Sequence, residues 1–212
     1  MYKTRSVYTN HIKEHSVIYF FMAILFLTGI VFGAVIVNSM NFVQKQDLFF
    51  YLDRFFGQLI EGSLTEKTQI LKESFSYHIK YLLFLFILGL SIIGMPVIWI
   101  MLFVKGMVVG FSVGFFVNQM GWKGLIFAAA SIAPQNLLII PVYLIAGSLA
   151  MIFSTALLRK LFSRRLQQPV LQPFMRYNVC FLVLAGFVGA ASFIESYIAK
   201  PAMQVIIEWI YL

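Results

Sequence analysis

Five long stretches of this chain contain no charged residue, and this pattern restricts the fold more than any other feature. A helix needs about 20 apolar residues to cross the hydrocarbon core of a bilayer, so runs of this length predict transmembrane helices. The composition agrees, because 61% of the residues are hydrophobic and 11% are charged, against roughly 25% charged in soluble domains. The charge-free runs cover residues 16–44, 81–104, 106–122, 124–158 and 177–194.

We therefore predict an all-α fold, an integral membrane helical bundle that forms a single domain over residues 1–212. Lys105 separates the second run from the third and is expected to mark a tight turn, and Pro96 is expected to kink the second span. The first run is longer than the 7–15 apolar residues of a signal peptide, which predicts an uncleaved first span. Five transmembrane helices are expected, over about residues 16–37, 81–104, 106–122, 136–158 and 177–194.

The basic residues between the runs predict the orientation. When the connecting segments are assigned alternately to two sides, the side of the N-terminus carries nine basic residues and one acid, a net charge of +8. The opposite side carries seven basic residues and seven acids, a net charge of zero. Because cytoplasmic loops are enriched in Lys and Arg, we expect a cytoplasmic N-terminus and an external C-terminus.

A basic segment over residues 159–176 lies between the last two predicted spans, on the cytoplasmic side. It contains no acid, and such a segment favours contact with anionic lipid. Membrane lipid, rather than nucleic acid, is the expected partner of the basic residues. Those in this segment are Arg159, Lys160, Arg164, Arg165 and Arg176.

The longest polar segment, residues 38–80, is expected outside as an amphipathic helical hairpin. Leu48, Leu52, Phe55 and Leu59 recur at helical spacing and predict one face directed toward the spans. Aromatic residues of the same segment either bind a partner or anchor in lipid headgroups. Phe50 and Arg54 project from a different side of the helix, and we predict that they form a partner surface.

Pro134, Gln135 and Asn136 interrupt the fourth charge-free run. Proline removes a backbone hydrogen bond, so a helix break is expected here, after a short re-entrant or interfacial piece over residues 124–135. The break either lines a path for a solute or ion, or is a helix start whose amides hold the bundle together.

Gly106, Gly110 and Gly114 recur at four-residue intervals. Small residues at this spacing let two helix backbones approach closely. The contact is expected either within the chain or between copies of a homo-oligomer.

We find no pattern that indicates an enzyme, a cofactor site or a metal site. His78 is interpreted as a residue of the outer membrane interface, and Cys180 as an apolar filler of the last span. Glu195 falls just beyond that span, so none of the five predicted spans contains a charge. This argues against ion-coupled transport, since charged groups inside the membrane mark ion paths.

Several segments in order resemble the stage II sporulation protein M family of endospore-forming bacteria. Each segment alone is a weak motif, and their order and spacing carry the resemblance over most of the chain. They are Phe32-Gly33-Ala34 to Asn38-Ser39, Gln44 to Leu48, Phe55 to Gln58, His78 to Tyr81, Gly89 to Gly94 with Pro96, Lys105-Gly106 to Gly114, and Pro134-Gln135-Asn136 with Pro141.

The resemblance implies a non-enzymatic membrane scaffold in forespore engulfment. It implies two peptidoglycan-degrading partners, sporulation proteins D and P, and a place in the mother-cell membrane at the sporulation septum. The residues alone leave an alternative from another class, a small channel or transporter that uses Gln135 and Asn136.

Overall fold

The computed structural model describes residues 14–60, 67–162 and 171–211 of the chain. These residues are almost entirely helical, which confirms the predicted all-α class. The elements are α2 (Ser16–Ser39), α3 (Phe42–Ile60), α4 (Lys67–Gly89), α5 (Gly94–Ser131), α6 (Ala133–Phe162), α7 (Leu171–Ile194), the π-helix η1 (Glu195–Ala199) and α8 (Lys200–Tyr211).

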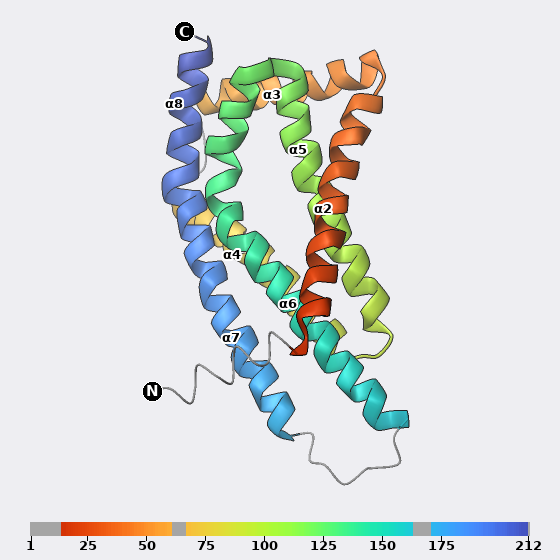
Figure 1. The fold of residues 1–212 in the computed structure, drawn as a ribbon. Helices are drawn as coiled ribbons and strands as arrows, with labels where there is room; N and C mark the ends of the chain where they lie inside the picture. The colour runs from red at the N-terminus through yellow and green to blue at the C-terminus, as the bar shows by residue number, and fades with distance from the viewer. Residues whose placement is uncertain (1–13, 61–66, 163–170, 212) are drawn as a thin grey trace.

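The helices form an elongated bundle (Figure 1). Helices α2, α5, α6 and α7 run along it, and α8 continues α7 toward the end at which α3 lies across the bundle (Figure 1). The α4–α5 turn, the end of α6 and the start of α7 lie at the opposite end (Figure 1).

Four helical segments of the described residues are long and apolar enough to cross a membrane, as expected of a membrane protein. They are Ser16–Ser39, Gly94–Ser131, Ala133–Leu161 and Leu171–Ile207. Helix α4 is not among them because its N-terminal half is polar, so the predicted count of five spans is not confirmed. The same half of α4 was expected in an outer hairpin, but α4 packs against α6 and α7 inside the bundle.

The predicted turn at Lys105 is wrong. The chain turns at residues 90–93, where the Leu90 and Ser91 amides each donate a hydrogen bond of 3.1 Å to a carbonyl of the last turn of α4. Glycines at the end of α4 and the start of α5 favour this turn. Lys105 lies inside α5, and Pro96 is the third residue of that helix, where a missing amide hydrogen costs nothing and no kink results.

The sharp change of direction along α5 occurs at Gly121. Its backbone angles, φ 57° and ψ −131°, lie outside the helical region and suit glycine because a Cβ would be strained there. After Gly121 the helix turns back and leads into α6 (Figure 1). The segment before Pro134 is therefore helical and belongs to the return arm.

The predicted break at Pro134 is not confirmed. Only Ile132 separates α5 from α6, and its backbone stays in the right-handed helical region. The Asn136 amide donates to the Ile132 carbonyl at 3.3 Å, and the Asn136 side chain donates to the same oxygen at 2.8 Å. Pro134 stands in the first turn of α6, a position at which helices tolerate proline.

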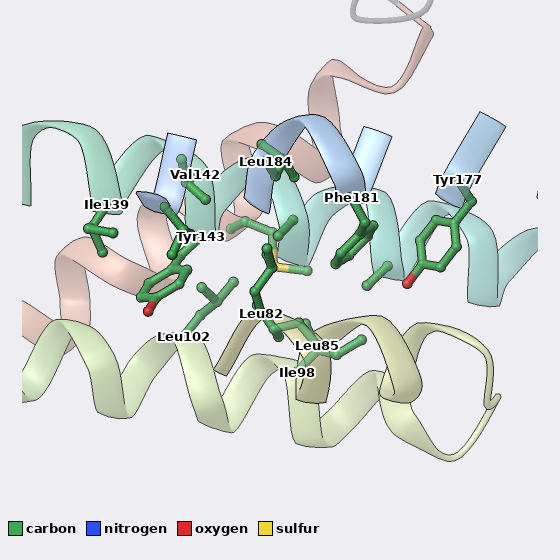
Figure 2. Close-up of a cluster of buried hydrophobic side chains, with 14 of the residues drawn as sticks. Leu82, Leu85, Ile98, Leu102, Ile139, Val142, Tyr143, Tyr177, Phe181 and Leu184 are labelled. Atoms are coloured by element: carbon green, nitrogen blue, oxygen red, sulfur yellow. The ribbon is translucent and has the colours of Figure 1, made fainter. Parts of the chain in front are cut away.

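The apolar core lies between α4, α5, α6 and α7, with Met22 of α2 added. Leu85, Ile98, Leu102 and Ile139 are almost fully buried in it. Tyr143 and Tyr177 lie toward the two ends of the cluster of side chains in Figure 2. At one of these ends, the Tyr177 hydroxyl donates a hydrogen bond of 2.9 Å to the Phe86 carbonyl.

Candidate functional site: a charged cluster inside the bundle

A chain of polar side chains connects three elements at the Tyr143 end of the core. The Ser74 hydroxyl donates to the Glu195 carboxylate, and His78 Nε2 lies 3.5 Å from the same carboxylate oxygen. The other ring nitrogen of His78, Nδ1, lies 2.7 Å from the Tyr143 hydroxyl oxygen. Carboxylate, imidazole and phenol thus form a continuous path along which a proton can be shared.

The sequence places these groups together through helix periodicity. Ser74 and His78 are four residues apart on α4 and therefore lie on the same face. Glu195 is the first residue of η1, where the helix widens to a π-helical turn. Such turns are rare and occur frequently at functional sites. Ser74 and His78 are buried, whereas the Glu195 side chain keeps 26% of its surface exposed.

Lys105 of α5 adds a positive charge beside this chain. Its ammonium nitrogen lies 5.1 Å from the ring centre of Tyr77, 5.4 Å from that of Tyr143 and 5.9 Å from that of Tyr81. Aromatic faces attract cations at such distances, and more strongly where water is excluded. The ammonium also interacts electrostatically with Glu195, so one positive and one negative charge balance within the cluster.

The cluster lies near the middle of the bundle's length. Helices α2 and α5 run in parallel contact, with Gly29 against the Phe103 carbonyl and Gly33 against the Met107 carbonyl. Lys105 lies between Phe103 and Met107 and is therefore level with the central part of α2. Both Lys105 and Glu195 fall inside the apolar helical segments that could cross a membrane.

The expectation that the spans contain no charge is therefore wrong. Two separate predictions account for this: a turn at Lys105, and a last span that ends at Ile194, where the charge-free run stops. His78 was expected at the outer interface, but it is buried against Tyr143. The sequence carries one signal for the correct turn: glycines flank residues 90–93, while Lys105 is the one charged residue among the 29 residues 94–122.

The predicted glycine series lies at the contact between α2 and α5 of the same chain. A Cβ on Gly106 would meet the Phe26 carbonyl, and one on Gly110 would meet the Ile30 backbone. At Gly114 the nearest atom would be Ala34 Cα at 3.3 Å. Close backbone approach within the chain thus accounts for all three glycines.

Gln135, Phe50 and Arg54 do not join the cluster. Gln135 lies near the start of α6, and its side-chain oxygen is buried without a hydrogen-bond partner among the described residues. Phe50 and Arg54 are exposed on α3, at the end of the bundle that Figure 1 shows crossed by that helix.

The basic segment is only partly described. Arg159 and Lys160 lie in the last turn of α6, where positive charge favours the helix dipole. Arg176 is exposed on α7, while Arg164 and Arg165 lie outside the described residues.

The described residues contain no group of three or more His, Cys, Asp or Glu side chains that could hold a metal ion. The cluster itself offers two other kinds of chemistry. It can bind or release a proton at His78 or Glu195, and its charges can fasten α4, α5, α6 and η1 to one another. Buried charges of this kind are stable only when they are paired and hydrogen-bonded.

A family model described as stage II sporulation protein M matches residues 22–200. Neither the comparison with curated proteins nor the comparison with solved structures found a match. The matched region extends from α2 through η1 and includes every residue of the charged cluster. Because the match covers most of this apolar helix bundle, the chain belongs to the stage II sporulation protein M family.

Proposed function

We propose that this membrane sporulation protein is a non-enzymatic scaffold that positions peptidoglycan hydrolases at the sporulation septum. In this proposal the partners are the sporulation proteins D and P, and the site of action is the mother-cell membrane during engulfment. The family match supports the link to sporulation. The arrangement of α3 supports a docking role.

The observation that carries the proposal is the way α3 is attached. Phe56 is 1% exposed and packs edge-on against Phe127, with ring centres 5.1 Å apart. With Ile207 of α8, these two side chains form a small apolar cluster separate from the main core. Helix α3 is thus held at one place across the end of the bundle.

The opposite side of α3 presents aromatic surface. Phe50 is 65% exposed and Tyr51 is 68% exposed, and their rings contact each other edge-on at 6.4 Å. Arg54 is exposed one helical turn beyond Phe50. Aromatic and arginine side chains are enriched among the residues that dominate protein–protein binding.

The test is copurification of the two hydrolases from sporulating cells. The double variant Phe50→Ala with Arg54→Ala is expected to lose hydrolase recruitment while its membrane level stays normal. A matched control is Phe20→Ala on α2, because Phe20 is 68% exposed but lies at the other end of the bundle. Full recruitment by the double variant would place the docking surface elsewhere, and an equal loss of protein and recruitment would indicate a structural role.

The charged cluster favours a second candidate, a small channel or transporter. Ionisable groups inside membrane helices commonly mark the paths of ions and protons, and this cluster is a stronger candidate for such a path than Gln135 and Asn136. Purified protein in liposomes distinguishes the candidates. Selective ion or solute flux that Glu195→Gln abolishes would support a channel, while absence of flux together with hydrolase copurification would support the scaffold.

A further inference from the structure

One face of α4 is polar and exposed along its N-terminal half. On this face the Gln69 side-chain amide donates a hydrogen bond of 3.1 Å to the Glu73 carboxylate. With Thr68 and Tyr77, the face lines a shallow hollow of about 700 Å³. Its polar members recur at helical spacing and are Gln69, Lys72, Glu73, Ser76 and Lys80.

This polar face lies at the same level as the apolar middle of the bundle. The Lys105 ammonium nitrogen lies 5.1 Å from the centre of the Tyr77 ring, and Lys105 is level with the central part of α2. Glu73 and Lys80 lie within about 6 Å of Tyr77 along the helix axis, at 1.5 Å per residue. Both charges are therefore near the middle of the apolar spans.

At this level α2 and α5 expose apolar side chains. Val31 of α2 is 63% exposed, and Val108 of α5 is 50% exposed. These surfaces suit lipid, but the α4 face does not, because charged side chains in membrane helices face protein or water rather than hydrocarbon. Something other than lipid must cover this face.

We propose that a second copy of this chain covers the polar face of α4. Copies in one membrane share the same orientation, so a two-fold axis along the membrane normal is the symmetry open to a pair. Such an axis brings each Lys72 to the level of Glu73 of the other copy, since the two residues are adjacent in the chain. Lys72 and Glu73 thus make this part of the face complementary to its own copy, whereas a face with charges of one sign would repel its own copy.

Ser76 lies at the centre of the face. Small polar residues at helix contacts allow close approach and can hydrogen-bond across the interface. This surface differs from the glycine series on α5, which is occupied by α2 of the same chain.

Cysteine crosslinking in native membranes tests this interface. In a Cys180→Ala background, Ser76→Cys is expected to give covalent dimers of this chain upon mild oxidation. Val31→Cys is the control, because it is exposed at the same level on a face assigned to lipid. Lys72→Glu and Glu73→Lys, added singly, are expected to reduce dimer yield severalfold, and the two together are expected to restore it.

Three results would overturn the proposal. A monomeric Ser76→Cys variant that reacts with a small water-soluble maleimide would show that water covers the face. A crosslink to a different protein would show a different partner, and equal dimer yields from Ser76→Cys and Val31→Cys would show random collision. If Ser76→Cys fails to accumulate in the membrane, Gln69→Cys gives the same readout from the same face.

Discussion

Substitution of Gly110 tests the closest contact between α2 and α5. The Cβ of an alanine at this position would lie 2.7 Å from both the carbonyl carbon and the Cα of Ile30. These are backbone atoms and cannot rotate away, so α2 and α5 must separate by about 1 Å, a gap that forfeits a quarter to a half of the dispersion attraction at each contact. Overpacking of this kind costs about 1–3 kcal/mol.

Gly186→Ala is the matched control. No atom lies within 4 Å of a Cβ built on Gly186, which is exposed on α7. Alanine is favoured over glycine inside a helix by up to about 1 kcal/mol, so this variant should be as stable as the wild type or slightly more stable. The two identical substitutions should therefore differ by about 1–4 kcal/mol in the free energy of unfolding.

Thermal unfolding of the purified protein in detergent measures the difference. One kcal/mol shifts the melting temperature of a domain of this size by about 2–4 °C, so Gly110→Ala should melt at least about 2 °C below Gly186→Ala. The melting temperature of Gly114→Ala should lie between those of the other two variants, because the nearest atom to the added Cβ would be Ala34 Cα at 3.3 Å. Equal melting temperatures for the three variants would refute the close α2–α5 contact.

Three further predictions concern charge. Lys105→Met and Glu195→Gln should each destabilise the protein by about 1–3 kcal/mol, less than for a fully buried pair because Glu195 is 26% exposed. The combined variant should recover part of that loss in the same melting assay, and simple additivity would contradict electrostatic coupling. Replacing Arg164 and Arg165 with Glu should reduce correct insertion, which membrane level and protease accessibility measure. A membrane level and a protease accessibility equal to those of the wild type would show that these charges do not set orientation. A reporter fused to the C-terminus should score outside the cytoplasm, and a cytoplasmic signal would exclude an odd number of spans.

The class of protein could be predicted from the amino-acid sequence alone. Charge-free apolar runs predict membrane helices because hydropathy is a local property that needs no knowledge of the partner surfaces. The all-α bundle could be predicted in this way, whereas the sporulation family was indicated by the resemblance of short motifs in order along the chain; both are confirmed. The close-packing role of glycines such as Gly110 could also be predicted, but the sequence did not name α2 as the helix they contact.

The position of the α4–α5 turn was misjudged for a specific reason. A lone charge between apolar runs is compatible with a loop or with the inside of a helix, and hydropathy does not distinguish the two. Turn-forming residues such as Gly89 and Gly94 favoured the correct position, but the charge of Lys105 was given more weight. Glu195 and His78 fall outside the predicted spans for a different reason: the last charge-free run ends at Ile194, and His78 belongs to the polar segment 38–80.

The charged cluster could not be predicted from the sequence. Ser74 and Glu195 are 121 positions apart in the chain, and His78 and Tyr143 are 65 apart. Their contact depends on how α4, α6 and η1 are rotated and shifted against one another, which the packing of the whole core sets. Local periodicity gives the face of one helix on which a residue lies, but it does not identify the helix opposite that face.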